Sequence, residues 1–175
     1  LWRVARDRPG DLRRVIEERR EAVESGLAYL EGLAANYARL RPPLDQAECD
    51  VNAVVRETVA AAPVPEHARV DPRLGGNVPA VRADRIALRR ILENLLRNAI
   101  DSLDARPGIV SVTTEVVPGE NDVPPAVRIT VADTGKGMSP AEQDRAFEAF
   151  YSTKPGGSGL GLTIVRRLVL DLGGR

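Results

Sequence analysis

Two asparagines and an aspartate interrupt an apolar pattern in ENLLRNAIDSL, residues 93 to 103. Asn94, Asn98 and Asp101 are spaced by four and then three residues, so an α-helix would place them on one narrow stripe. The neutral carbonyl oxygen of asparagine can coordinate a hard Mg²⁺ ion that already carries phosphate oxygens and waters. The alternative is a solvated helix face, since asparagine has many uses there.

A second candidate lies in DTGKGM, residues 133 to 138, directly after a strand of alternating apolar residues. The carboxylate of Asp133 could accept a hydrogen bond from an exocyclic amine such as adenine N6. Gly135 and Gly137 permit a tight turn close to a flat ring. Taken alone, however, this composition favours an ordinary turn.

The third candidate is YSTKPGGSGLGLTIV, residues 151 to 165, a glycine-rich segment that opens into a helix. Unpaired N–H groups and the positive end of the helix would converge where phosphates could bind, and Lys154 could add a mobile charge. The pattern is neither a Walker A loop nor the dinucleotide fingerprint. One glycine-rich loop is a weak signal, but three moderate signals in this order are much stronger.

The predicted elements explain how these candidates would be positioned. A helix beginning at Ala83 or Asp84 carries the polar stripe, with its leucines on the opposite face. Period-2 alternation predicts strands over 108–117 and 126–133, and another helix begins near Gly159. A helix over 50–61, capped by Asp50, precedes two short strands near 68–71 and 79–82. This order predicts an α+β protein, a two-layer α/β sandwich with helices on one face of a mixed sheet.

The first part of the chain reads differently. Residues 11–40 lack proline, and small or apolar residues recur at steps of four and three, which predicts a long helix with a coiled-coil-like seam. Such a helix cannot bury its own seam, so we expect a helix bundle that forms a homodimer, rather than a helix packed on its own domain. RPPLDQ then breaks it. The predicted domains are 1–41, a linker over 42–49, and 50–175.

Composition excludes several classes of function. Twenty-five basic residues balance twenty-five acidic ones, so no global charge favours nucleic acid. A single cysteine and a single histidine leave no disulfide framework and no zinc cluster. With no apolar run near the roughly 20 residues that cross a bilayer, we expect no direct membrane contact and a cytoplasmic location, although the parent protein could be membrane-anchored.

Four motifs in one order resemble a known family. ENLLRNAIDSL, DTGKGM, AFEAFYSTK and GGSGLGL are similar to the N box, first glycine box, phenylalanine box and second glycine box of the sensor histidine kinase ATP-binding domain. That domain belongs to the gyrase, Hsp90, histidine kinase and MutL superfamily. The resemblance covers about residues 50 to 175, and FYSTK is similar to the nitrogen-regulation type of kinase. It implies a Bergerat-type ATP-binding fold, here C-terminally truncated because the last strands are missing.

The resemblance also implies the site. Asn98 would bind Mg²⁺, Asn94 would line the phosphate side, and these two are the catalytic candidates. Asp133 would bind adenine. Residues from about 136 to 158 would form a lid over ATP, anchored by Phe147 and Phe150. The other implied ATP-binding positions are Asp101, Gly135, Gly137, Met138, Lys154, Gly157, Ser158, Gly159, Leu160 and Gly161.

The implied function is that of a two-component sensor histidine kinase. The domain would present the γ-phosphate of ATP to a histidine outside this chain, for later transfer to an aspartate of a response-regulator receiver domain. His67 follows two prolines outside any helical pattern, so we expect a surface histidine rather than the acceptor. Residues 1–41 resemble the second helix of the dimerisation and histidine-phosphotransfer bundle, and the acceptor is expected before Leu1. This chain should then bind ATP without phosphorylating itself.

Two alternatives stay open. A serine kinase or hydrolytic ATPase of the same superfamily would use the same pocket. Hydrolytic relatives carry a glutamate where this chain has the neutral Asn94, which argues against hydrolysis, although Glu93 is its neighbour. The second alternative is a non-catalytic nucleotide-binding dimer scaffold.

Overall fold

The computed structural model describes residues 20, 45–119, 124–154 and 157–175. All of these except Arg20 belong to one compact unit, Leu44–Arg175. The predicted bundle helix within 1–41, apart from Arg20, and the start of the predicted linker lie outside the described residues, so the domain boundaries stay a prediction.

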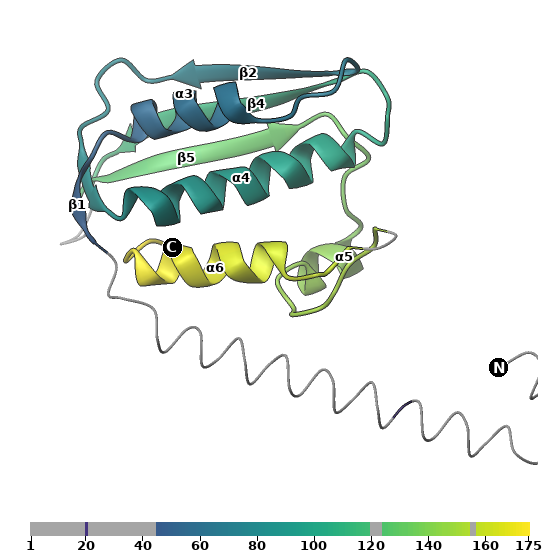
Figure 1. Cartoon of the computed structure of the whole chain (residues 1–175). Helices are drawn as coiled ribbons and strands as arrows, with labels where there is room; N and C mark the ends of the chain where they lie inside the picture. Colours follow the sequence, from purple (N-terminus) through teal and green to yellow (C-terminus); the bar gives the residue numbers. More distant parts are fainter. Residues whose placement is uncertain (1–19, 21–44, 120–123, 155–156) are drawn as a thin grey trace, which may run out of the picture. The chain divides into compact units, whose positions relative to one another are not determined.

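The main sheet has three strands in the order β2–β4–β5 (Figure 1). β2 (Ala68–Leu74) is parallel to β4 (Gly108–Val117), with Ala68 opposite Gly108. β5 (Ala126–Asp133) is antiparallel to β4, with Val117 opposite Ala126. The two long strands of this sheet, β4 and β5, begin and end where the alternation predicts. A separate pair joins β1 (Ala47–Cys49) to β3 (Val81–Ala83).

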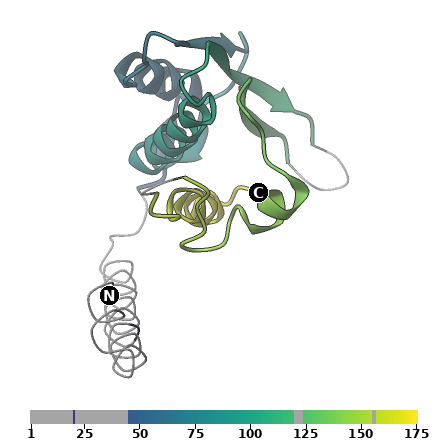
Figure 2. The same ribbon diagram turned by 90° about the vertical axis from the view of Figure 1, so that its right-hand side faces the viewer.

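α3 (Val51–Ala61) and α4 (Arg85–Ser102) form a second layer on one face of this sheet, as the turned view shows (Figure 2). α6 (Gly161–Asp171) packs on α4, and the short α5 (Pro140–Arg145) lies in the segment between β5 and α6. The side chain of Asp50 accepts from Ala53 N at 2.9 Å and that of Asp84 accepts from Ala87 N at 2.9 Å. Each aspartate thus satisfies one free N–H at the start of its helix. The architecture is the predicted two-layer α/β sandwich with a mixed sheet.

α4 belongs to two hydrophobic clusters. Leu88, Leu92 and Leu96, with the C-cap residue Leu103, join α3 and the sheet in the large cluster, where Val110 and Val112 are fully buried. On another side of α4, Ala87 and Ile91 pack with Val165 and Leu168 of α6. The sheet layer and α6 are therefore both packed on this one helix, which leaves its remaining face for polar side chains.

Two elements were not predicted. β1 lies in the predicted linker, and its register opposite β3 places Cys49 beside Val81. α5 lies in the segment expected to form the lid, for which no helix was predicted. The last helix begins at Gly161, slightly later than expected. Within the described ranges, the structure contains no helix both long enough and apolar enough to span a bilayer.

Candidate nucleotide-binding site

The polar stripe of α4 faces the second glycine motif. A Cβ atom built on Gly161 would lie 3.4 Å from Asn94 Oδ1 and 3.8 Å from Asn98 Nδ2. The amide group of Asn94 donates to Arg90 O at 2.8 Å, one turn earlier on the helix. Its oxygen is therefore the atom that faces the glycine. Two motifs far apart in the sequence thus meet around a small space that a side chain at 161 would fill.

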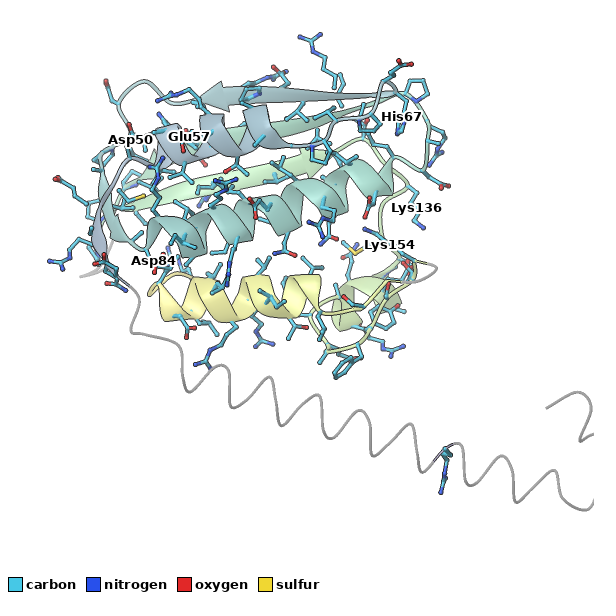
Figure 3. All side chains as sticks on the ribbon, in the orientation of Figure 1. Asp50, Glu57, His67, Asp84, Lys136 and Lys154 are labelled. Atoms are coloured by element: carbon cyan, nitrogen blue, oxygen red, sulfur yellow. The ribbon has the colours of Figure 1, made fainter. Side chains whose placement is uncertain are left out.

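A lysine from the phenylalanine box reaches the same stripe. Lys154 Nζ lies 2.8 Å from Asp101 Oδ2 and 3.3 Å from Asn98 Oδ1. Figure 3 shows Lys154 between the C-terminal half of α4 and the loop before α6. Both charged side chains are partly exposed, 35% for Lys154 and 44% for Asp101. The oxygens of Asn98 and Asp101 therefore already hold one cation, the lysine ammonium group.

The end of β5 carries the first glycine motif. Asp133 Oδ1 accepts hydrogen bonds from Ser102 Oγ at 2.6 Å and from Gly135 N at 2.9 Å. A Cβ on Gly135 would overlap the Ser102 hydroxyl and lie 2.5 Å from the Ser102 carbonyl oxygen. The turn after β5 therefore packs tightly on the last residue of α4, and this contact fixes the position of Asp133.

Ser102 is the site residue that the sequence interpretation missed. It follows Asn94 and Asn98 at the same step of four, so it continues the polar stripe toward the C-terminal end of α4. This spacing is the feature of the sequence that could have identified Ser102 as a site residue. Eight residues of helix correspond to about 12 Å between the glycine contact and the Asp133 contact. The two groups therefore form the ends of an elongated site along one helix.

The segment predicted to form the lid begins with an exposed turn and α5. Gly137 has a φ of +69°, a conformation that glycine adopts without strain. Met138 is 55% exposed, and its carbonyl oxygen accepts from Gln143 Nε2 at 2.9 Å. Ser139 and Glu142 form a capping box at the start of α5. The hydroxyl and then the backbone N–H of Ser139 lower the pKa of Glu142 below its ordinary 4.5.

Backbone contacts join the later part of the predicted lid to the start of the second glycine motif. Phe150 N donates to Gly159 O at 3.0 Å, and a Cβ on Gly159 would overlap the Phe150 backbone. Both residues have a φ of 66°, which is strained for the phenylalanine. Phe147 and Phe150 are 48% and 45% exposed. In this structure the backbone, rather than buried rings, holds this end of the lid.

The predicted phosphate-binding segment ends at the start of α6. Gly157 N donates to Lys154 O at 3.1 Å, and Leu160 N donates to Ser158 Oγ at 3.4 Å, so both contacts close short turns. Leu160 is the N-cap of α6, and no side chain caps this end of the helix. The first N–H groups of α6 are thus available to an anion.

These residues fit a nucleotide with magnesium. Asn98 and Asp101 hold the lysine ammonium group, which shows that their oxygens suit a cation. In the described ranges, no group of three or more His, Cys, Asp or Glu side chains could hold a metal ion. A magnesium ion would therefore share Asn98 with phosphate oxygens and waters, as this ion prefers.

Two residues with possible reactive roles lie elsewhere. The carboxylate of Glu93 pairs with Arg89 Nε at 2.8 Å, in a cleft of about 350 Å³ between α3 and α4. His67 is half-buried in the turn before β2, where its carbonyl oxygen accepts from Gly108 N at 3.0 Å (Figure 3). It lies outside any helix, as predicted, although it is less exposed than expected.

A comparison with known families identifies the family of this chain. The family described as "Histidine kinase-, DNA gyrase B-, and HSP90-like ATPase" matches residues 83–175. The chain belongs to this family, and the resemblance inferred from the four boxes is confirmed. The finer likeness to nitrogen-regulation kinases stays a prediction.

Bacterial sensor proteins are similar to this chain in sequence. The C4-dicarboxylate transport sensor protein DctS of Rhodobacter capsulatus is 34% identical over 137 residues, which cover 77% of this chain and 20% of that protein. The sensor histidine kinase ZraS of Escherichia coli strain K12 is 35% identical over 97 residues, covering 55% of this chain and 19% of that protein. The chain thus spans about a fifth of the length of the curated relatives it matches.

Solved structures share the fold. ShkA, solved at full length in complex with AMPPNP, has a TM-score of 0.65 at 31% identity and covers 94% of this chain and 35% of its own. Histidine kinase ThkA, solved in complex with response regulator protein TrrA, has a TM-score of 0.64 at 21% identity, covering 96% of this chain and 46% of its own, and shows the fold alone. The domain is an ATP-binding domain homologous to the catalytic domains of sensor histidine kinases.

Proposed function

We propose that this chain contains the catalytic ATP-binding domain of a two-component sensor histidine kinase. It binds ATP with Mg²⁺ along the polar stripe of α4 and presents the γ-phosphate to a histidine outside the chain. The attacking atom is an imidazole nitrogen, which needs no strong base. The domain therefore contributes positioning and charge neutralisation.

The observation that carries this proposal is the identity of the side chain against Gly161. Asn94 Oδ1 occupies that place, and an amide oxygen cannot take a proton from water. The neighbouring carboxylate of Glu93 is paired with Arg89 and lines the cleft between α3 and α4. Neither position 94 nor position 93 therefore places a carboxylate where it could activate water. This favours transfer of the phosphoryl group over hydrolysis.

Asn98 is the proposed ligand of Mg²⁺, and bound Mg²⁺ would supply neutralisation of the phosphate charge. Asp101 would add negative charge beside it, and Lys154 offsets that charge. The uncapped start of α6, with Gly157, Gly159 and Gly161 around it, would contribute N–H groups to the phosphates. Asp133 would accept a hydrogen bond from the adenine amine.

The assembly around the domain is part of the same proposal. Residues 1–41 would form the second helix of a dimerisation bundle, joined by a linker over 42–49, and the acceptor histidine would lie on another helix of that bundle. A response-regulator receiver domain would then take the phosphoryl group, a partner supported by the ThkA complex with a response regulator. The catalytic domain would work in the cytoplasm, as part of a longer soluble or membrane-anchored protein.

The test supplies the missing acceptor. The chain is mixed with Mg²⁺, γ-labelled ATP and a separate polypeptide that carries the acceptor helix of a related kinase. We expect acid-labile, base-stable label on the histidine of that helix, and its loss with Asn98→Ala. Arg97→Ala, on the adjacent exposed position of α4, serves as the matched control and should transfer normally.

Other outcomes of this test assign other functions. Release of labelled inorganic phosphate at a comparable rate without an acceptor would identify a hydrolytic ATPase, and label on serine would identify a serine kinase. Tight ATP binding without transfer or hydrolysis, with several acceptor helices, would favour the non-catalytic scaffold.

A further inference from the structure

Ser102 joins the end of α4 to the turn that follows β5. Its hydroxyl oxygen lies 2.6 Å from Asp133 Oδ1, and its carbonyl oxygen accepts from Lys136 N at 3.1 Å. Two different atoms of Ser102 thus hold two different points of the same turn. The helix end and the turn form one local unit around Asp133.

The hydroxyl group has one proton and two neighbouring acceptors. Ser102 Oγ also lies 2.7 Å from Ala99 O, within its own helix. The carboxylate is charged and lies at the shorter distance, so it is the stronger acceptor for that proton. Gly135 N donates to the same carboxylate oxygen, Oδ1, at 2.9 Å. Ser102 and Gly135 therefore occupy Oδ1 and fix the plane of the carboxylate.

This arrangement leaves the second oxygen for a ligand. Among the described residues, Asp133 Oδ2 has no hydrogen-bond partner, and the side chain is exposed. An ionised carboxylate only accepts hydrogen bonds, so Oδ2 suits an amine and repels a carbonyl oxygen. A Cβ at Gly135 would overlap the Ser102 hydroxyl, so the pair of Ser102 and Gly135 also sets how closely the turn approaches α4.

We propose that Ser102 is a positioning residue for base selectivity. By holding Oδ1, it orients Oδ2 toward the 6-amino group of adenine, and this inference rests on the proposed function. A purine that lacks this amine gains nothing from the oriented oxygen, and a 6-oxopurine is repelled by it. Ser102 thus determines the preference among purine nucleotides without touching the base.

The test compares two nucleotides that differ only in the amine. Calorimetry measures the affinity of the chain, with Mg²⁺, for ATP and for purine riboside triphosphate, which has hydrogen in place of the 6-amino group. We expect Ser102→Ala to weaken ATP binding by roughly three- to tenfold and to change binding of the analogue by less than about twofold. Ser102→Thr keeps a hydroxyl group and should preserve the ATP preference.

Further variants separate this role from a structural one. Ser102→Cys keeps the size of the side chain but donates only weakly, so it should behave like the alanine variant. Asn98→Ala is the control at the other end of the site and should weaken both nucleotides equally. Equal weakening of both nucleotides by Ser102→Ala, or no effect on ATP, would overturn the inference while leaving ATP binding intact. Failure of the unaltered chain to bind ATP would instead refute the proposed function.

Discussion

The ammonium group of Lys154 lies 2.8 Å from Asp101 Oδ2, bridging the phenylalanine box and the N box. Because both side chains are partly exposed, the pair contributes at most about 1 kcal/mol to stability. In the proposed site its larger effect would concern the ligand, since the carboxylate of Asp101 would repel nearby phosphates unless a cation offset its charge.

Reversing this pair gives a first prediction. Lys154→Glu should lower ATP affinity by about tenfold or more, because it places two carboxylates beside the phosphate side of the site. Adding Asp101→Lys returns a positive charge to the same place and should restore much of the affinity. Calorimetry at low and high salt measures both effects. If the double variant binds no better than Lys154→Glu, the pair is not the relevant contact.

Asn98→Ala tests the proposed metal ligand. In the unaltered chain, Mg²⁺ should increase the affinity for ATP. Loss of the amide oxygen in Asn98→Ala should reduce that Mg²⁺-dependent increase by at least about tenfold. Affinity without Mg²⁺ should change little. The comparison is made by titrating ATP with Mg²⁺ and with EDTA, and an unchanged Mg²⁺ effect would exclude Asn98 as the ligand.

A carboxylate in place of Asn94 should move the chemistry toward water. Asn94→Glu places a general base against Gly161, so we expect acceptor-independent hydrolysis of ATP to rise by about tenfold or more. Glu93→Gln, which alters the residue paired with Arg89, should leave hydrolysis unchanged. Phosphate release under saturating ATP measures both. A rise with the Glu93 variant, or none with Asn94→Glu, would contradict the assignment.

Gly161→Ala should change stability and binding in opposite directions. The methyl group makes only ordinary contact with Asn94, so the helix should gain up to about 1 kcal/mol of stability. The same methyl group occupies the space between the two asparagines and α6, so ATP affinity should fall by about tenfold. Gly159→Ala should instead be destabilising, because φ is 66° and its Cβ meets the Phe150 backbone. Thermal unfolding and calorimetry separate the two cases.

Acid should open the start of α5. The pKa of Glu142 is lowered in the folded protein, so its capping contact stabilises α5 above about pH 4.5 and is lost as the pH falls through the folded value. NMR of the α5 amides should show fraying once the pH falls below the folded pKa of Glu142. Ser139→Ala should bring the pKa of Glu142 back up and fray α5 even near neutral pH, whereas Ser139→Thr should behave like the unaltered chain.

Much of the fold follows from local pattern. β4 and β5 alternate strictly enough to give their bounds, and Asp50 and Asp84 mark the starts of α3 and α4. β1 has three residues, and its partner β3 is distant in the sequence, so its pairing depends on the tertiary fold. α5 is six residues long and buries none of them, which leaves no periodic signal beyond its cap.

Part of the candidate site also follows from local sequence pattern, and part depends on the tertiary fold. The stripe of Asn94, Asn98 and Asp101 follows from helix geometry alone. That Lys154 reaches this stripe depends on how the loop before α6 folds, which spacing does not report. Ser102 had the right spacing, but its role becomes visible only when the end of β5 is seen to lie against it.

Mutations in the small hydrophobic cluster that joins α4 to α6 should alter nucleotide affinity. Ala87, Ile91, Val165 and Leu168 pack α6 on α4, and the first residue of α6, Gly161, faces Asn94 and Asn98. Altering the volume of these four side chains should shift the start of α6 relative to the two asparagines. A screen for mutants with altered nucleotide affinity should therefore recover changes at Ile91 or Leu168, buried residues that no bound nucleotide would touch.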